Sequence, residues 1–486
     1  MPADIKLDEI NMIKPRWLSS SRAMLGEFEK LKNEGLIPLN GQFYPAVHYP
    51  GITMYPPINE NELFKGYANP KNGLFSIYVH IPFCRRYCSF CHYPVKTGAL
   101  ASEQERDYYL NSLKEEIDIY IKRLGLGVIK ASSVLFGGGT PTHLTLRQLN
   151  EFLRFFTSKV DLRHCRQFSY DVDPSTITGR EGIERLKLMK SYGGDRITLG
   201  IQSLDDAVLK KMNRPHNRDE AIKAIKESKK AGFKLNLEFI YGFPGQSVES
   251  WVDTIKQAVE LGVEEIQLYR IKIIPYGDHM SAMTGAYKVW PDSFTPIEQV
   301  ILMKQLAILI LNENGYQENL GRVFTKNKND FSRYADEQCC RLYDQIGFGL
   351  TAFSSLRDRF ALNTQDFKLY YFLINQGKLP INRGLIRDKD TQLRWALILP
   401  LKNREVYKPD FEKITGVSPN EIFSKKIQKL KDFGLLQEDD KTLALSTLGR
   451  FFADEVCQQF YYPKYLPFAQ AEYAAGELNP YNCSGV

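Results

Sequence analysis

The sequence predicts an α/β fold, a partial (β/α)6 barrel of the TIM type with an N-terminal extension and a mostly helical C-terminal domain. Short runs of β-branched and aromatic residues recur six times in the first 290 residues. Segments with apolar residues at helical spacing separate these runs. Regular alternation of strand and helix is typical of a parallel sheet whose connections are helices.

Each predicted element has a local justification. In the first predicted helix, Tyr109, Leu113, Ile117 and Ile121 recur at helical spacing, and Gly232 follows the fourth helix as a natural C-cap. The six strands are expected over residues 76–81, 132–136, 167–172, 196–201, 234–242 and 265–273. The intervening helices are expected over residues 104–124, 145–159, 180–192, 219–231 and 247–261.

The alternation predicts four regions. A proline- and tyrosine-containing extension spans residues 1–73, and the barrel core spans 74–290. A barrel-completing segment over 291–375 begins with a helix at about 296–315 and continues into a glycine- and serine-rich stretch. A helical domain occupies 376–486, and its strand pair near 435–446 resembles the hairpin of a winged-helix module.

Composition excludes several classes of protein. The 486 residues are 43% hydrophobic and 25% charged, as in an ordinary globular protein. The sequence has no uninterrupted run of about 18 apolar residues, so a membrane-spanning helix is not expected. The net charge of +7 is not concentrated in a Lys/Arg run, so we expect no nucleic-acid partner. The N-terminus lacks the apolar core of a secretion signal, which favours a cytoplasmic protein.

Three of the eight cysteines, Cys84, Cys88 and Cys91, lie within eight residues. Their C-x3-C-x2-C spacing suits three ligands of a [4Fe–4S] cluster, with one iron left open for a substrate or cofactor. A structural zinc site is the alternative, in which His80 or His92 supplies the fourth ligand. The other five cysteines are scattered, so a disulfide framework is not expected.

Polar residues and glycines follow the predicted strands at the end where barrel enzymes place their active sites. Glycines after the second strand can bring backbone N–H groups close to a ligand, although three glycines also make an ordinary turn. Asp173 can equally cap a helix, and a lone arginine is usually a solvated surface residue. The candidates are Gly137–Pro141, Asp171, Asp173, Gln202, Arg214, Glu238, Tyr269, Arg270 and Lys272.

Six motifs in order resemble the radical S-adenosylmethionine superfamily and, within it, the HemN-like group, named for oxygen-independent coproporphyrinogen III oxidase. They are YVHIPFCRRYCSFC, FGGGTPTHL, DVDP, GDRITLGIQS, NRPH and LEFIYGFPGQS. The resemblance runs from about residue 74 to 360, and more weakly to about 460. It implies that a reduced cluster cleaves S-adenosylmethionine to a 5′-deoxyadenosyl radical, which abstracts hydrogen from an inert carbon.

The resemblance also implies site residues and two molecules of S-adenosylmethionine. Tyr78, Gly138, Asp171 and Phe353 match positions that contact the cluster-bound molecule. Phe90, Gly139, Thr140, Gln202, Arg214, Glu238 and Lys272 match positions around the second molecule. Asp171 stands where the family usually has Glu, Glu238 where it has Asp, and Lys272 where it has a small residue.

Two departures from the family shape the functional expectation. His92 and Tyr93 follow Cys91 where the coproporphyrinogen enzyme has a further cysteine, and about 75 residues precede the cluster strand. We therefore expect methyl or methylene transfer to an sp2 carbon, as in the class C methyltransferases and cyclopropane-forming enzymes. Haem or porphyrin modification is the alternative, and a non-enzymatic haem-binding chaperone is the competitor from another class.

Methylene addition needs a group that accepts a proton, and the candidates are Tyr93, Glu238 and Lys272. The expected partners are a small-molecule substrate, planar or aromatic, and an electron donor such as flavodoxin or ferredoxin. The aromatic run over residues 460–468 can line a pocket for a flat substrate or pack onto the rest of the chain.

Overall fold

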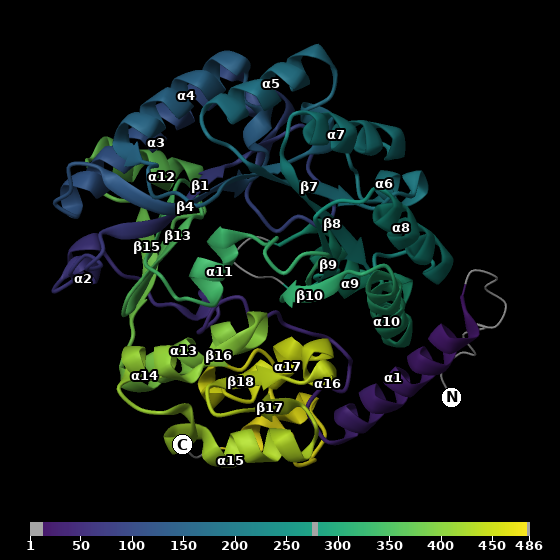
Figure 1. Cartoon of the computed structure of the whole chain (residues 1–486). Helices are drawn as coiled ribbons and strands as arrows, with labels where there is room; N and C mark the ends of the chain where they lie inside the picture. Colours follow the sequence, from purple (N-terminus) through teal and green to yellow (C-terminus); the bar gives the residue numbers. More distant parts are fainter. Residues whose placement is uncertain (1–12, 275–279, 484–486) are drawn as a thin grey trace.

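The computed structural model describes residues 13–274 and 280–483. It confirms the predicted partial barrel. Six parallel strands lie side by side in the order β1-β4-β6-β7-β8-β9, with helices on their outer face (Figure 1). The strands are β1 (Leu74–Ile81), β4 (Ile129–Gly138), β6 (Phe168–Val172), β7 (Arg196–Gln202), β8 (Lys234–Tyr241) and β9 (Glu265–Arg270).

The covering helices fall where helical spacing predicts them. They are α3 (Glu103–Arg123), α4 (Leu146–Lys159), α5 (Gly179–Ser191), α7 (Arg218–Lys230) and α8 (Val248–Glu260). A short helix that the sequence pattern did not predict, α6 (Asp206–Lys211), follows β7. Alternate strand residues such as Val79, Leu199 and Phe239 are fully buried. The barrel core therefore forms from the apolar runs that predicted the strands.

Both edges of the parallel sheet are extended by strands that the pattern did not predict. β12 (Gln345–Phe348) pairs in parallel with β1, and β13 (Phe353–Leu356), β14 (Arg359–Asn363) and β15 (Ile381–Ile386) continue the sheet in antiparallel fashion. At the other edge, β11 (Val323–Thr325) pairs with β9, and β10 (Gln317–Leu320) pairs with β11. The described strands leave the barrel open between β10 and β15.

The N-terminal extension is more regular than the sequence indicated. It contains α1 (Pro15–Asn33) and α2 (Glu60–Phe64), and α1 packs against α10 (Ile297–Glu313). Residues 291–313 form a helical segment long and apolar enough to cross a membrane, but 56% of its most apolar window is buried inside the protein. Since α10 packs against both α1 and α8, it is a core helix of this fold.

The C-terminal region contains α13 (Lys389–Asn403), α14 (Lys408–Thr415), α15 (Pro419–Asp432), α16 (Thr447–Phe451) and α17 (Ala453–Gln458). The predicted hairpin is β17 (Leu436–Glu438) and β18 (Thr442–Leu445), and β16 (Glu405–Tyr407) adds a third strand. Two further helices, α11 (Arg333–Cys339) and α12 (Phe367–Asn375), precede this region, and α9 (Ala282–Val289) follows β9.

The aromatic run over residues 460–468 belongs to the packing of the C-terminal region. Phe460 and Tyr461 are almost completely buried. The Phe460 ring lies 5.6 Å from Phe423, and the Tyr461 ring lies 4.8 Å from Tyr49 of the N-terminal extension. Of the two interpretations of this run, the structure therefore favours packing over a substrate pocket.

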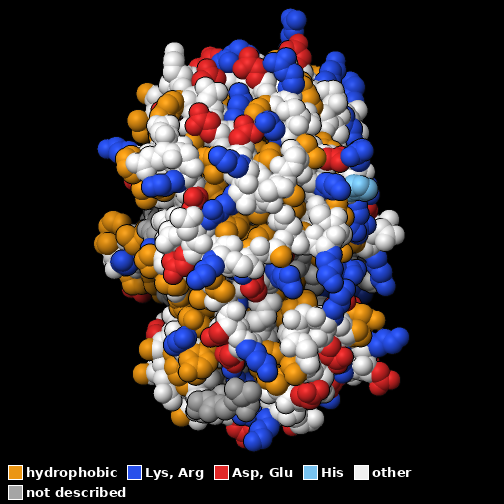
Figure 2. All heavy atoms as spheres, turned by 90° about the vertical axis from the view of Figure 1, so that its left-hand side faces the viewer, with side chains coloured by type: hydrophobic (Ala, Val, Ile, Leu, Met, Phe, Trp, Pro, Cys, Tyr) orange, Lys and Arg blue, Asp and Glu red, His pale blue; other side chains and the backbone are white. Residues whose placement is uncertain are grey.

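Charge is spread rather than gathered on the face that Figure 2 shows. Lysine and arginine side chains alternate there with aspartate and glutamate, and hydrophobic side chains are scattered between them. On this face the surface thus matches the expectation from the sequence that no dense basic run concentrates the net charge.

A buried ion pair at the base of the barrel allows a test of the fold. Arg196 and Glu265 are 4% and 1% exposed, and two 2.7 Å bonds join the guanidinium to the carboxylate. Replacing Arg196 with Met leaves the carboxylate buried without its partner, which costs about 3–5 kcal/mol. Calorimetry should show a fall of several degrees in the apparent melting temperature. Arg180→Met, which removes the exposed Arg180–Glu184 pair, is the matched control and should leave the melting temperature unchanged.

Candidate functional site

The three clustered cysteines lie in the loop between β1 and α3, just after β1 reaches the barrel mouth, where Cys84 ends the short strand β2 (Phe83–Cys84). The Sγ atom of Cys84 lies 3.5 Å from the Thr140 hydroxyl. Arg214 donates to the Sγ atom of Cys88 at 3.2 Å, and the Tyr93 N–H donates to that of Cys91 at 3.4 Å. Each sulfur thus has a polar neighbour, although burial raises the pKa of Cys84 and of Cys91, and the thiolate is the form that binds iron.

Both histidines of the zinc alternative have other polar neighbours in this geometry. The Tyr78 hydroxyl lies 3.0 Å from Nδ1 of His80, and Nε2 of His92 donates to the Lys272 carbonyl oxygen at 3.1 Å. Three thiolates without a fourth protein ligand suit a cluster with one open iron.

The glycines after β4 let two loops touch at the barrel mouth. Gly138 has φ +100°, and a Cβ atom there would lie 2.5 Å from the His80 ring. A Cβ atom on Gly139 would lie 2.7 Å from the Ile81 carbonyl oxygen, to which the Gly139 N–H donates at 2.8 Å. Any larger residue would push this loop away from the cysteine loop. The glycines therefore do more than make a turn.

Arg214 is buried and bonded to several groups of the site, and is therefore not a solvated surface residue. Its side chain is 9% exposed, and one of its terminal nitrogens lies 2.5 Å from both the Asp173 carboxylate and the Gly200 carbonyl oxygen. Burial alone would raise the pKa of Asp173, but the positive charge of Arg214 holds it below its ordinary value. Gln202, with φ +68°, lies beside Gly200, because a Cβ on that glycine would be 3.0 Å from the Gln202 amide.

Two carboxyl groups, Asp171 on β6 and Glu238 on β8, lie close enough inside the barrel to interact electrostatically. Burial raises the pKa of Asp171 to about 6, against the opposing charge of Arg196. Burial and the charge of Asp171 together raise the pKa of Glu238 to about 8, and the Tyr269 hydroxyl donates to it at 3.3 Å. Near neutral pH Glu238 therefore holds a proton, and it becomes a base only above about pH 8.

The other two candidate proton acceptors lie at the same mouth. The Tyr93 ring is about half exposed and lies 5.7 Å from His80. Lys272 follows β9. Burial and the positive charges of Arg322 and Lys402 lower the pKa of its amine well below its ordinary value. An amine in this environment accepts protons less readily than an ordinary lysine.

The two predicted phenylalanines lie on different walls of the site. Phe90 packs against a small apolar cluster that includes Ile240 and Ile271, beside Tyr269. Phe353 begins β13, where it stacks on Phe360 and meets the edge of His48 at 4.4 Å. The roles predicted for these residues toward S-adenosylmethionine remain predictions.

The sequence did not indicate two buried residues that support the site, His48 of the N-terminal extension and Glu116 of α3. His48 is buried against Phe353 although it lies 305 positions earlier in the chain. Glu116 accepts the Gly349 N–H at 2.8 Å and the Tyr370 hydroxyl at 2.6 Å, which fixes the loop before β13. Thr351 of that loop lies 3.3 Å from His80. Only the position of Glu116 on the buried face of a predicted helix could have indicated it.

Comparison with known proteins adds to this geometry. The radical SAM superfamily domain matches residues 78–258, and the HemN C-terminal domain matches residues 383–452. The Bacillus subtilis haem chaperone HemW is 25% identical over 395 residues, covering 79% of this chain and 98% of that protein. The Escherichia coli oxygen-independent coproporphyrinogen III oxidase is 26% identical over 443 residues, covering 85% and 92%.

The fold agrees. The solved structure of the E. coli coproporphyrinogen III oxidase HemN matches with a TM-score of 0.70 at 23% identity, over 83% of this chain and 93% of that one. The chain therefore has a radical SAM domain over residues 78–258. A HemN C-terminal domain follows it, and the chain is similar to the HemN-like group over most of its length.

The cofactors of this class are a [4Fe–4S] cluster and S-adenosylmethionine. The chain offers Cys84, Cys88 and Cys91 as the three cluster ligands, and their polar neighbours fit that role. When bound, the cluster and S-adenosylmethionine together supply a carbon-centred radical that abstracts hydrogen. The task of the protein is to orient both groups and to exclude water from them.

The cysteine assignment can be tested by iron content. Cys88→Ala removes one thiolate and leaves Arg214 with a buried charge that has lost one of its partners. We expect anaerobically reconstituted wild type to hold about four irons per chain and the variant to hold less than half of that. Cys165→Ala, outside the loop, is the control and should keep the wild-type content. Equal iron content in all three proteins would contradict the assignment.

The raised pKa of Glu238 predicts a pH-dependent stability. Between its ordinary pKa and about 8, the folded protein holds a proton that the unfolded chain has lost, so this group makes stability fall as pH rises. Glu238→Gln cannot ionise and should gain on the order of 2 kcal/mol relative to wild type between about pH 5 and pH 9. Thermal unfolding of the reconstituted protein measures this, with the exposed Glu249→Gln as control. Parallel pH profiles for wild type and Glu238→Gln would contradict it.

Proposed function

We propose that this protein is an oxygen-independent radical SAM enzyme that abstracts hydrogen from a carboxylate-bearing tetrapyrrole, a porphyrinogen or a haem. The observation that carries the proposal is the extent of the similarity, which includes the barrel, the barrel-completing strands and the C-terminal region. Two of its relatives are named for coproporphyrinogen III and for haem. The substrate then belongs to the same chemical class.

The charge at the barrel mouth supports an anionic substrate. Lys272 follows β9, and Arg322 and Lys402 are close enough to lower its pKa. A substrate carboxylate placed beside Lys272 would gain a charge-assisted hydrogen bond and restore the ordinary protonation of that amine. The buried His48, whose pKa is lowered to about 3 by burial and by the same lysines, adds a neutral ring to this wall. The site thus offers both positive charge and flat aromatic surface.

The residues of the chain then have distinct tasks. Arg214 holds Cys88 and Asp173 in one arrangement, and the glycines of β4 bring the backbone against the cysteine loop. Protonated Glu238 presents a hydrogen-bond donor inside the barrel. We further propose that Gln202, Arg214, Glu238 and Lys272 surround a second S-adenosylmethionine, as the family resemblance implies.

An electron donor must reach the cluster from outside, and the surface beside the cysteine loop is basic. Arg85, Arg86, Lys210 and Lys211 are exposed there, and the Ser89 hydroxyl donates to the Lys211 carbonyl oxygen at 3.3 Å. Basic surfaces steer acidic partners toward a site. We propose that an acidic flavodoxin or ferredoxin docks here, in keeping with the cytoplasmic location expected from the sequence.

Methyl or methylene transfer is the second candidate. It is favoured by Lys272, because an amine with a strongly lowered pKa has a neutral fraction that can take the proton such an adduct must lose. The absence of a further cysteine after His92 also separates this chain from the coproporphyrinogen enzymes that the motif resembles. None of the relatives reported above is named as a methyltransferase.

Product analysis separates the candidates. The reconstituted holoenzyme is incubated anaerobically with dithionite, S-adenosylmethionine and coproporphyrinogen III, and 5′-deoxyadenosine and S-adenosylhomocysteine are quantified. We expect tetrapyrrole-dependent 5′-deoxyadenosine without S-adenosylhomocysteine. Equal amounts of the two products with an sp2-carbon acceptor would favour methylene transfer. Tight haem binding without 5′-deoxyadenosine would overturn the enzymatic proposal and favour a chaperone.

Lys272 provides a sharper test. Lys272→Met keeps the length of the side chain and removes its charge, so the KM for a tetrapyrrole should rise roughly tenfold while uncoupled cleavage of S-adenosylmethionine continues. Lys288→Met on α9 is the matched control. An unchanged KM in Lys272→Met would remove Lys272 from the substrate site.

A further inference from the structure

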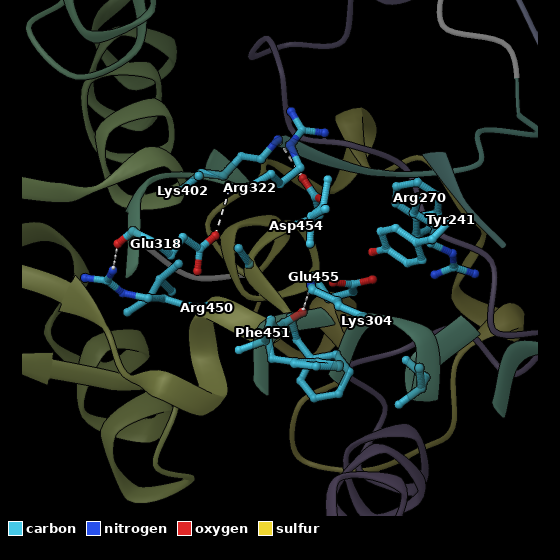
Figure 3. A pocket seen from close by; sticks show the side chains of 18 of the residues that line it. Tyr241, Arg270, Lys304, Glu318, Arg322, Lys402, Arg450, Phe451, Asp454 and Glu455 are labelled. Carbon is cyan, nitrogen blue, oxygen red and sulfur yellow. Dashed lines mark hydrogen bonds and ion pairs between the residues drawn. The ribbon is translucent and has the colours of Figure 1, made fainter. Parts of the chain in front are cut away.

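A partly open cavity of about 80 Å³ lies outside the cysteine site, between the edge of the barrel and the C-terminal region (Figure 3). We call it the interdomain cavity. Its walls come from the ends of β8 and β9, from α10, from the turn between β10 and β11, and from α13, α16 and α17. None of the three cluster cysteines lines it. The cavity is therefore a separate feature from the radical site.

The lining carries more positive than negative charge. Three acidic residues line the cavity: Glu318, Asp454 and Glu455. Six basic residues line it: Arg270, Lys304, Arg322, Lys402, Arg404 and Arg450. Burial and the charge of Asp454 raise the pKa of Glu455, which weakens its contribution of negative charge. The lining thus has three more basic than acidic residues, although burial lowers the pKa of Lys304 and of Lys402.

The hydrogen bonds and ion pairs of these cations neutralise only part of that excess. Lys402 forms an ion pair with Asp454 at 2.7 Å, and Arg404 pairs with Asp336, which lies outside the lining. Arg270, Lys304 and Arg450 donate to carbonyl oxygens, those of Gly41, Phe451 and Glu318. Within the described part of the chain, those three cations and Arg322 form no ion pair. Carbonyl groups orient these cations but do not supply a counter-charge.

Arg322 is a lining cation with a buried hydrogen-bond donor that has no partner among the described residues. That donor is its Nε atom. The Arg322 guanidinium lies 4.9 Å from the centre of the Tyr269 ring. The backbone N–H of Arg322 donates to the Glu318 carboxylate at 2.7 Å. The residue has φ +70°, so the turn holds it in a left-handed conformation. Figure 3 shows Arg322 beside Lys402 and Asp454 on one wall of the cavity.

We propose that the interdomain cavity binds a small oxyanion, a carboxylate or phosphate group, through Arg322 and Lys402. Buried positive charge without a counter-ion is costly, and an oxyanion supplies both the charge and the acceptors that Arg322 lacks. Guanidinium groups bind carboxylate and phosphate in the same forked geometry. The cavity has room for a group of several heavy atoms, since one water requires about 10–15 Å³.

This site is linked to the radical site by charge. Arg322 and Lys402 are two of the charges that lower the pKa of Lys272 at the barrel mouth. An oxyanion bound beside them offsets their effect and moves Lys272 toward its ordinary charged form. Occupancy of the cavity therefore tunes the cation that faces the substrate. Binding of an oxyanion in the interdomain cavity does not depend on which substrate the radical site takes.

Binding is measured directly on the reconstituted full-length protein by calorimetric titration with inorganic phosphate and, separately, with succinate, at an ionic strength fixed by chloride. We expect saturable binding of at least one of them to wild type, and roughly tenfold weaker binding to Arg322→Gln. Arg180→Gln on α5, where the arginine is 94% exposed, is the matched control and should bind as wild type does. Competition by coproporphyrinogen III would assign the site to a carboxylate of a tetrapyrrole, whereas its absence would assign it to a free anion.

The folding of each variant is checked before its binding is interpreted. Arg322→Gln is used only if its far-ultraviolet spectrum and iron content match wild type; otherwise Arg322→Lys replaces it, since a lysine keeps the charge but loses the fork. The bound anion should raise the melting temperature of wild type more than that of either variant. No saturable binding of phosphate or succinate to wild type, or equal binding to Arg322→Gln, would overturn the proposal.

Discussion

One buried guanidinium sets the geometry around which the site is built. Arg214 bonds to a cysteine sulfur of the cluster loop, to a carboxylate after β6 and to a backbone carbonyl of β7. Because a buried charge is costly when it loses a partner, these three elements can move only together. A thiol loop that would otherwise be free to rearrange is thereby fixed to two strands of a rigid sheet. Arg214, which the sequence indicated as a binding residue, therefore also holds these three elements together.

The open barrel imposes a second constraint, which the two ends of the chain satisfy together. Residues of α1 and of the C-terminal helices share one hydrophobic core, in which Phe28 and Leu31 pack with Trp395 and Leu397. The N-terminal extension then runs past the barrel and places His48 against Phe353. Closure of the barrel, the aromatic wall of the site and the position of the C-terminal region therefore depend on one another.

The sequence predicted what repeats locally and missed what depends on distant partners. The six parallel strands and their helices have strong periodicity, and the thiol spacing and glycine motifs identify the chemistry without a structure. β12 and β13 are short and rich in glycine and serine, and they become strands only because β1 offers a free edge. The contact of His48 with Phe353 and the bonds of Glu116 join residues more than 200 positions apart. No local pattern encodes such contacts.

Electrostatics links the parts that the sequence treated separately. Inside the barrel, burial and the charge of the Asp171 carboxylate together raise the pKa of Glu238. At the mouth, burial and the charges of Arg322 and Lys402 lower the pKa of Lys272. These two cations belong to the interdomain cavity, and Lys402 is carried by α13 of the C-terminal region. The pKa of Lys272 is therefore set partly by a residue of the C-terminal region, which contributes none of the three clustered cysteines. A change in how that region packs on the barrel edge would move Lys402 and so change the electrostatic environment of Lys272.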